Sequence, residues 1–341
     1  EGPPNRSHFF GYFSICVTVT IVIALAGNLV TFLLFYEMLT LATYPLVIHR
    51  GTIKSLRAGR NYLIYAFGGG AVFLFAVVWL QTVVGMVDFS AAGFSSSFIG
   101  SDGTALIWIF FLLIIGVGVK AALVPLHGWL PQAMVAPAPV SALLHAVAVV
   151  KAGAFGIIRI VLDVYGAQNL LLLGVLPFLG IIAAITILYG SIRALQQDGL
   201  KRRLAFSTIS QVSYIALGMS MVDQPLAVIG GLVHLVHQGL MKITLFFCAG
   251  NLAETLGIHR ISEMDGVARR MPLTMVAFSI GALGMIGIPP TVGFVSKWYL
   301  GLGSLAVTVS SSFALFALAR VVSGASAGII SALVVASVAD R

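Results

Sequence analysis

The chain has 341 residues, of which 59% are hydrophobic and only 9% are charged, and its mean hydropathy is +1.06. A soluble globular domain has about a quarter of its residues charged, so this composition excludes that class and indicates a polytopic membrane protein. The formal net charge of +8 does not indicate nucleic-acid binding, because the basic residues lie in short runs between apolar segments, as membrane topology requires.

Neither cysteine indicates a disulfide framework or a metal site. Cys16 and Cys248 lie in separate apolar stretches without CxxC spacing. The N-terminus shows no charged segment before a short apolar core, so we expect no signal peptide. The chain starts at Glu1 and not at Met, and we therefore expect the natural N-terminus to lie further upstream.

Apolar stretches long enough to span a bilayer, about 20 residues each, recur along the whole chain. They predict an all-α membrane protein of about 10 or 11 transmembrane helices. The predicted spans are 9–26, 29–49, 61–84, 105–123, 140–162, 170–192, 204–221, 226–250, 272–288, 292–308 and 313–338.

Positive charge is confined to alternate loops, whereas the loops between them contain Asp88, Asp102, Asp163 and Asp223 without Lys or Arg. This asymmetry predicts that the basic loops are cytoplasmic and that the N-terminus lies on the same side of an inner (plasma) membrane. Arg159 and Asp163, four residues apart, are expected to pair at the opposite interface. The basic loop residues are Arg50, Lys54, Arg57, Arg60, Arg193, Lys201, Arg202, Arg203, Arg260, Arg269 and Arg270.

A second group of ionisable residues lies within the predicted spans, where topology does not explain it. A charge at the bilayer centre costs about 3 kcal/mol on insertion scales, so such residues line polar paths or pair with one another. One such residue could be a packing partner, but eight in one chain favour a path for protons or cations. They are Glu37, Lys120, His145, Lys151, His234, His237, Lys242 and Lys297.

Two proline breaks lie beside two of these lysines. Pro125 follows Lys120, and Pro289 with Pro290 precedes Lys297. Interrupted helices in corresponding places predict two inverted repeats with unwound backbone lining a cavity at mid-membrane. The alternative is that these prolines only kink packing helices.

Four stretches resemble, in order and spacing, the antiporter-like subunits of respiratory complex I, Mrp-type sodium/proton antiporters and membrane-bound hydrogenases. The resemblance extends from Phe9 to Leu302. Because a histidine and a lysine both follow the first break, the chain looks most similar to the D component of Mrp antiporters or to the hydrogenase-associated membrane proteins. The stretches are VKAALVPLHGWLPQAMVAPAPVSALLHAVAVVKAGAFGIIR, RRLAFSTISQVSYIALG, HLVHQGLMKITLFFCAGN and GIPPTVGFVSKWYL.

The resemblance implies roles for the buried ionisable residues. Glu37 matches the family glutamate that pairs with the lysine before the broken helix, here Lys120. One departure is visible, since the family often has a second histidine four residues after the first, whereas this chain has Gln238 there and His237 one residue earlier. The other matched relay positions are Lys151 with His145, Lys242 with His234, and Lys297.

The implied mechanism is a proton relay. Burial favours a neutral lysine and a nearby carboxylate favours the charged form, so movement of Glu37 would make Lys120 hold or release a proton. The proton would then pass through Lys151, His145 and water to Lys242 and Lys297. We expect a non-catalytic subunit without a cofactor or metal of its own, driven by partner subunits of a complex I-like or Mrp-type assembly, with Na⁺ as a second candidate ion.

Two other function classes remain open from the residues. A b-type cytochrome would use His145 with His234 or His237 as haem ligands, although the lysines would then have no role. A self-contained secondary transporter would use the midplane lysines as substrate or coupling-ion sites.

The C-terminal stretch departs from the antiporter-like pattern. FALFALARVVSGASAGIISALVVASVADR resembles a helix and loop of a major facilitator transporter, with Gly324 and Gly328 in GxxxG spacing. We therefore predict an N-terminally truncated antiporter-like domain over residues 1–302 and an extra transmembrane helix of separate origin within 303–341. A divergent antiporter-like helix is the alternative for this segment.

Overall fold

The computed structural model describes residues 6–90 and 92–306, and these residues form helices without a β-strand. Six of the described helices are long and apolar enough to cross a membrane, which confirms the all-α membrane class. The predicted helix over 313–338, together with Gly324 and Gly328, lies outside the described residues. The chain divides into two units, one made of the residues up to Val140 with Val147–Leu179, the other made of Ser141–Ala146 and the chain from Gly180 onward.

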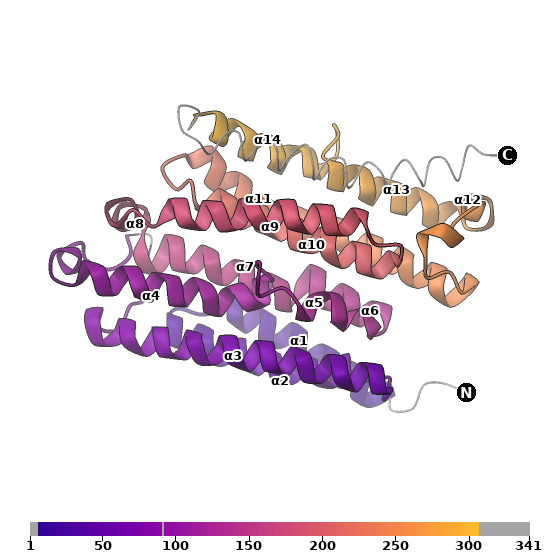
Figure 1. Cartoon of the computed structure of the whole chain (residues 1–341), viewed down its shortest axis with the longest axis horizontal. Coiled ribbons are helices and arrows are strands. Elements are labelled where there is room, and N and C mark those ends of the chain that lie inside the picture. The colour runs from indigo at the N-terminus through magenta and orange to yellow at the C-terminus, as the bar shows by residue number, and fades with distance from the viewer. Residues whose placement is uncertain (1–5, 91, 307–341) are drawn as a thin grey trace. The chain divides into compact units, whose positions relative to one another are not determined.

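The first unit is built on four long helices, α1 (Arg6–Leu25), α2 (Leu29–Val47), α3 (Ile53–Val84) and α4 (Ser97–Ala121). Within this unit α1 packs on α2, α2 on α3, and α3 on α4, and the last two run side by side along their lengths (Figure 1). The shorter helix α7 (Val149–Arg159) packs against α4, and α8 (Ala167–Leu173) follows it. The predicted spans 9–26, 29–49, 61–84 and 105–123 correspond to the four long helices, whereas the span 140–162 is interrupted.

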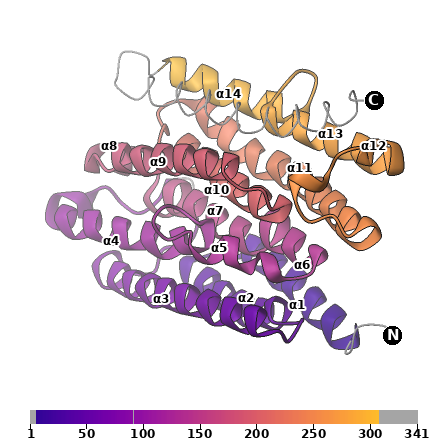
Figure 2. The same cartoon turned by 45° about the vertical axis from the view of Figure 1, so that its right-hand side comes forward.

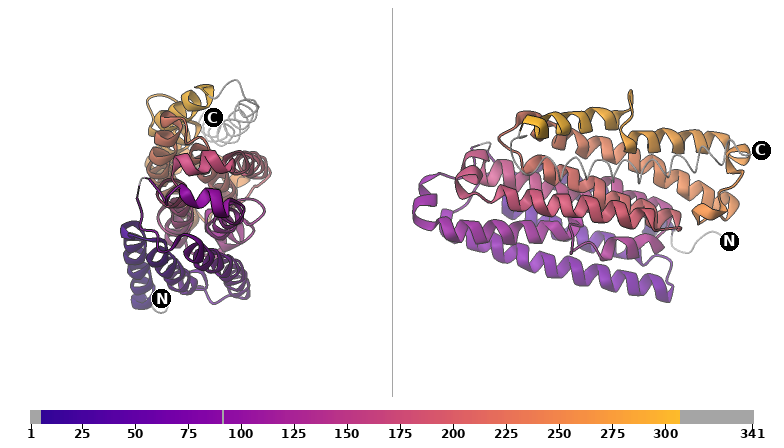
Figure 3. Two further views of the ribbon diagram at one scale, coloured as in Figure 1. Left: turned by 90° about the vertical axis from the view of Figure 1, so that its left-hand side faces the viewer. Right: turned by 45° about the horizontal axis from the view of Figure 1, so that its top comes forward.

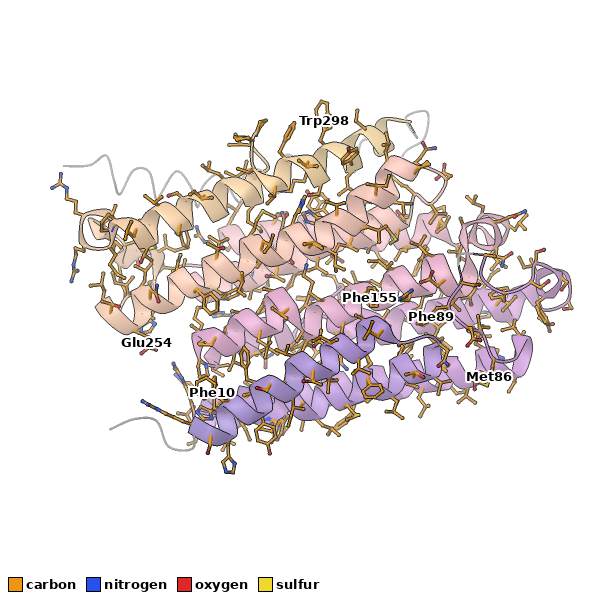
Figure 4. All side chains as sticks on the ribbon, turned by 180° about the vertical axis from the view of Figure 1, so that it is seen from behind. Phe10, Met86, Phe89, Phe155, Glu254 and Trp298 are labelled. Atoms are coloured by element: carbon orange, nitrogen blue, oxygen red, sulfur yellow. The ribbon has the colours of Figure 1, made fainter. Side chains whose placement is uncertain are left out.

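At the end of the first unit that contains Asp88, the side chain of Arg159 forms an ion pair and lies against two aromatic rings. The Arg159 guanidinium donates to Asp163 Oδ2 at 2.7 Å, which confirms the predicted pair. The same group lies 5.0 Å from the Phe89 ring centroid and 4.8 Å from that of Phe155, and Figure 4 shows these two aromatic residues next to each other. The pair therefore has a structural role.

The second unit is organised around the long helix α11 (Pro225–Leu256). It packs against α10 (Leu200–Met219), α13 (Pro272–Ile286) and α14 (Val292–Ala306). Helix α9 (Leu176–Leu195) lies along α10 (Figures 1 and 2), where Gly190 meets the α10 backbone at Phe206 and Ser210. Short helix α12 (Val267–Arg270) lies in the loop before α13.

In the second unit, hydrogen bonds join the loops 196–199 and 257–271 at one end of the helices. Leu200 N donates to the His259 carbonyl at 3.0 Å, and Ile261 N donates to the Asp198 carbonyl at 2.9 Å. Hydrogen bonds from the backbone and hydroxyl of Ser262 lower the pKa of the Asp198 carboxyl below its ordinary value. The charged carboxylate thus helps to hold the two loops together.

Both predicted helix breaks are present. In the first unit α4 ends at Ala121, Ala122 takes a left-handed conformation with φ 57°, and Pro125 follows in the turn. In the second unit α13 ends at Ile286, Gly287 has φ 85°, and the two prolines Pro289 and Pro290 precede α14. Figure 3 shows the interruption between α13 and α14. Proline supplies no N–H for helix continuation, and both breaks leave carbonyl groups for other donors.

Neighbouring groups pack closely against the backbone at the first helix break. The Trp129 indole on short helix α5 (Trp129–Gln132) donates to the Val119 carbonyl at 2.8 Å. A Cβ built on Gly153 of α7 would lie 2.7 Å from the Lys120 carbonyl carbon. Only glycine therefore lets α7 approach the end of α4 this closely, as small residues do at membrane helix interfaces.

We expect Gly153→Ala to destabilise the protein by about 1–3 kcal/mol, because the added methyl group meets backbone that cannot move aside cheaply. Thermal unfolding in detergent measures the change. Gly68→Ala on α3 is the matched control, since no atom lies within 4 Å of a Cβ built there. Equal melting temperatures for the two variants would contradict this packing account.

Candidate functional site

Glu37 of α2 and Lys120 of α4 meet inside the first unit. Lys120 Nζ lies 3.6 Å from Glu37 Oε1, and the lysine side chain is 1% exposed whereas the glutamate is 27% exposed. Glu37 Oε1 accepts no hydrogen bond from the described residues. The two predicted partners are therefore together, but the contact is longer than the about 2.7–2.9 Å of a tight charge-assisted hydrogen bond.

The Lys120 ammonium also contacts neutral groups. It donates to the backbone carbonyl of Tyr36, and it lies 3.4 Å from the centroid of the Tyr36 ring. The Tyr36 hydroxyl in turn donates to the Val117 carbonyl at 3.3 Å. The lysine is thus fixed by neutral groups, and the position of the carboxylate sets its electrostatic field.

The Glu37 carboxylate rests against bare backbone of α3. A Cβ built on Gly70 would lie 2.7 Å from both Cδ and Oε1 of Glu37. The Thr40 hydroxyl is 3.5 Å from Glu37 Oε2, at the limit of a hydrogen bond. Glycine at position 70 therefore provides the space in which the carboxylate can approach Lys120.

The segment with His145 and Lys151 differs from the single helix that we expected. His145 lies in a π-helical turn, Leu143–Val147, and Ala148 has non-helical φ and ψ of −102° and −86° before α7 begins at Val149. The break at Ala148 interrupts the predicted span 140–162, so the expectation of one continuous helix there is wrong. Lys151 is 7% exposed in the first unit, two residues before the close contact of Gly153 with Lys120.

The residues of the second unit are arranged along one buried face of α11. Lys242 is fully buried and donates to the Leu204 carbonyl at 2.9 Å and to the Ser207 hydroxyl, both on α10. One turn further along α11, the ring of Phe246 lies 4.8 Å from the ring of His145. His145 is fully buried, and neither of its ring nitrogens has a hydrogen-bond partner among the described residues.

His234 and His237 do not share an environment, although their spacing predicts a common face. His234 is fully buried, its Nδ1 is 2.9 Å from the Ser296 hydroxyl, and its ring lies 5.8 Å from that of Tyr214. His237 is only half-buried and lies near the backbone of Val292. Gln238 is the residue that follows His234 on the buried face.

Lys297 lies at the second helix break. Its ammonium donates to the Met285 carbonyl and, at 3.4 Å, to the Ile286 carbonyl, the last two residues of α13. A cation at a helix C-terminus interacts favourably with the helix dipole. The Tyr214 ring centroid is 5.7 Å from Lys297 Nζ, so the same tyrosine lies near both His234 and Lys297.

Haem ligation does not fit these positions. His145 lies beside Phe246, which is twelve residues along α11 from His234 and nine from His237, rises of about 18 Å and about 14 Å. His234 and His237 lie on the same helix and cannot place their rings on opposite faces of one haem. The geometry therefore argues against the b-type cytochrome interpretation.

Sequence reasoning missed the uncharged residues that hold the lysines. Tyr36 contacts Lys120, Ser207 contacts Lys242, and Tyr214 with Ser296 contacts His234. A signal was present in α10, where Ser207, Gln211 and Tyr214 recur at helical spacing within an otherwise apolar span. Such a polar stripe indicates a face turned toward buried polar partners.

A transmembrane family described as "NADH:quinone oxidoreductase/Mrp antiporter, TM" matches residues 26–325 of the chain. The chain belongs to this family. The matched range begins after α1, includes both helix breaks and extends past Leu302, where the resemblance of the motifs ends. The assignment of residues 303–341 to a separate origin stays a prediction.

Relatives within the NADH:quinone oxidoreductase/Mrp antiporter family match over most of this chain. NADH-quinone oxidoreductase subunit N of Desulforudis audaxviator is 38% identical over 304 residues, which are 89% of this chain and 60% of that protein. Hydrogenase-4 component B of Escherichia coli is 35% identical over 302 residues, 85% of this chain and 44% of that protein. The chain thus spans about half the length of these curated relatives.

A solved structure of the same family has the same fold. A chain in the structure of the Mrp complex from Dietzia sp. DQ12-45-1b superimposes with a TM-score of 0.83 at 26% identity. The superposition covers 95% of this chain and 35% of that chain. The family and the membrane fold that the motifs predicted are therefore confirmed.

We expect Gly70→Ala to weaken the electrostatic coupling between Glu37 and Lys120, because the new methyl group must displace the carboxylate. Glu37→Gln, Lys120→Met and the double variant give a coupling free energy from thermal unfolding, of the order of 0.5–3 kcal/mol for residues in contact. Repeating this cycle in a Gly70→Ala background should give a smaller coupling. An unchanged coupling would show that Gly70 does not position the carboxylate, and Gly68→Ala is the control background.

Proposed function

We propose that this chain is a proton-translocating subunit of a larger membrane complex of the complex I, Mrp or membrane-bound hydrogenase kind. Membership of the NADH:quinone oxidoreductase/Mrp antiporter family supports the proposal. The buried ionisable residues of each unit provide the groups through which protons would move. Under this proposal the chain itself catalyses no redox reaction, and partner subunits or a counter-ion gradient supply the energy.

The observation that carries the proposal is the Lys120–Glu37 pair. Lys120 is almost fully buried in an apolar helix bundle, where an isolated ammonium is costly. Lys120 donates to the Tyr36 carbonyl, whereas the Glu37 carboxylate is partly exposed and its Oε1 accepts no hydrogen bond from the described residues. Approach of the carboxylate favours the protonated lysine, and its withdrawal favours release of the proton.

The remaining buried groups supply further proton positions within each unit. In the first unit Lys151 lies on α7 close to the end of α4, where Lys120 is placed. In the second unit His145, Lys242, His234 and Lys297 are buried along α11 and at the break before α14. We propose that protons occupy these groups in turn, and that His237, half-buried beside Val292, serves at the edge of the path.

We also propose the orientation and location that the charged loops predict. In the second unit the fastened loops 196–199 and 257–271 contain Arg260, Arg269 and Arg270, whereas the turn after α10 contains Asp223. In the first unit Arg50, Lys54 and Arg57 likewise lie at the end opposite Asp88. The positive-inside rule then places the basic ends in the cytoplasm and the chain in an inner (plasma) membrane.

The test is proton flux in vesicles that contain the chain with its genomic neighbours, comparing wild type with Lys120→Ala and Glu37→Ala. Both variants should lose at least 90% of the flux at normal expression, because the first lacks the proton-carrying group and the second lacks the group that controls it. Lys54→Ala, an exposed lysine at the start of α3, is the matched control and should retain the flux.

The same vesicles distinguish the driving mechanisms. Flux that depends on a sodium gradient supports the antiporter form, and flux that depends on a redox substrate supports the respiratory form. Unchanged flux in both Lys120→Ala and Glu37→Ala would overturn the proposal. Solute uptake by the purified chain alone would instead support a self-contained transporter.

A further inference from the structure

The facing surfaces of α10 and α11 follow one antiparallel register. Ser207 meets Lys242 near the start of α10, and Tyr214 meets His234 near its end. Moving seven residues along α10 thus corresponds to moving eight residues back along α11. Gln211, midway on α10, is therefore opposite Gln238, midway on α11, while its neighbour Ser210 faces α9 through a 2.8 Å contact with Ser191.

Gln238 is a buried amide whose polar atoms are not satisfied by protein groups. Its side chain is fully buried, and neither Oε1 nor Nε2 has a hydrogen-bond partner among the described residues. Gln211 opposite is 2% exposed. Buried polar groups without protein partners are usually bonded to ordered water, and such water requires a polar site with two to four partners.

Gln238 also lies between two groups that can bind a proton. It is four residues from His234 and four from Lys242 on the same face of α11, and those eight residues span a rise of about 12 Å. A hydrogen bond reaches about 3 Å, so no direct transfer joins the two side chains. The glutamine amide does not itself titrate in the physiological range.

We propose that Gln238, with Gln211 opposite it, binds a cluster of ordered water that connects Lys242 to His234. Gln238 is then a positioning residue, which acts by orienting water and carries no proton itself. The amide offers both donors and an acceptor to this water, and the Ser207 hydroxyl beside Lys242 lies at one end of the cluster. This inference rests on the proposed proton path and adds to it a neutral, water-filled step.

The first test measures hydration independently of transport. In the full chain with Cys16 and Cys248 replaced by Ala, the Gln238→Cys variant in membranes is labelled with deuterium in D2O, and conversion of its thiol S–H to S–D is followed by infrared spectroscopy. Leu245→Cys is the matched control, because Leu245 is 2% exposed on the same helix and lies against apolar groups such as Gly281. Gln211→Cys serves as the second labelling site if Gln238→Cys does not fold.

The expected result is labelling at position 238 or 211 at a rate at least tenfold above that at position 245. Equal rates would show that the site is dry and would overturn the proposal. This readout does not depend on whether the chain transports protons.

The second test separates water binding from packing. Gln238→Leu keeps most of the side-chain volume and removes both polar atoms, whereas Gln238→Asn keeps the amide and loses volume. Proton flux in the assembled complex should fall at least tenfold in Gln238→Leu and be better retained in Gln238→Asn. The opposite order, or wild-type flux in Gln238→Leu, would overturn the proposal.

Two further variants make the outcomes distinguishable. Gln81→Leu on α3 applies the same substitution away from the buried lysines and should leave the flux unchanged. Lys242→Ala tests the underlying path, and wild-type flux in that variant overturns the proposed proton path of the second unit. Loss of flux in Lys242→Ala with normal flux in Gln238→Leu overturns only the role of Gln238.

Discussion

The positions of the ionisable groups depend on one interaction, in which a buried lysine donates a hydrogen bond to a backbone carbonyl of a neighbouring helix. Lys120 donates to Tyr36 of α2, Lys242 to Leu204 of α10, and Lys297 to Met285 of α13. A carbonyl accepts a hydrogen bond but cannot take the proton at physiological pH, so it holds the side chain in place in either charge state. Under the proposed relay, the charge of each lysine is set by groups that approach or withdraw from it, such as the Glu37 carboxylate or water.

The interrupted helices account for one of these contacts, because Lys297 binds carbonyls at the end of α13, whereas Tyr36 and Leu204 lie inside α2 and α10. A continuous α-helix uses its carbonyls internally, whereas a helix end leaves the last four without partners. The end of α13 presents Met285 and Ile286 to Lys297, and the end of α4 presents Val119 to Trp129. Gly153 lets α7 approach the end of α4 closely, and Gly70 leaves room on α3 for the Glu37 carboxylate.

Sequence predicted the part of this arrangement that depends on hydropathy and on strong breakers. Most of the predicted spans within the described residues correspond to helices because each is a long apolar run, although the span 140–162 is interrupted. Pro125 and Pro289 marked both breaks because proline cannot continue a helix. The π-helical turn at His145 and the break at Ala148 were missed, since neither carries a proline or glycine signal. The three-residue spacing of His234 and His237 predicted that they share a face of α11. In the structure Gln238, and not His237, is buried with His234. The reason is that the neighbours α10 and α14 decide which face of α11 is buried.

The central claim is that the buried lysines are retained for proton transfer and not for stability. The most direct measurement is proton flux per folded molecule in Lys242→Met, with the melting temperature of the same preparation. Methionine fills much of the lysine volume without a charge to desolvate, so the account predicts that flux is lost while the melting temperature equals or exceeds that of the wild type. A lower melting temperature with unchanged flux per folded molecule would contradict the account and assign Lys242 a structural role.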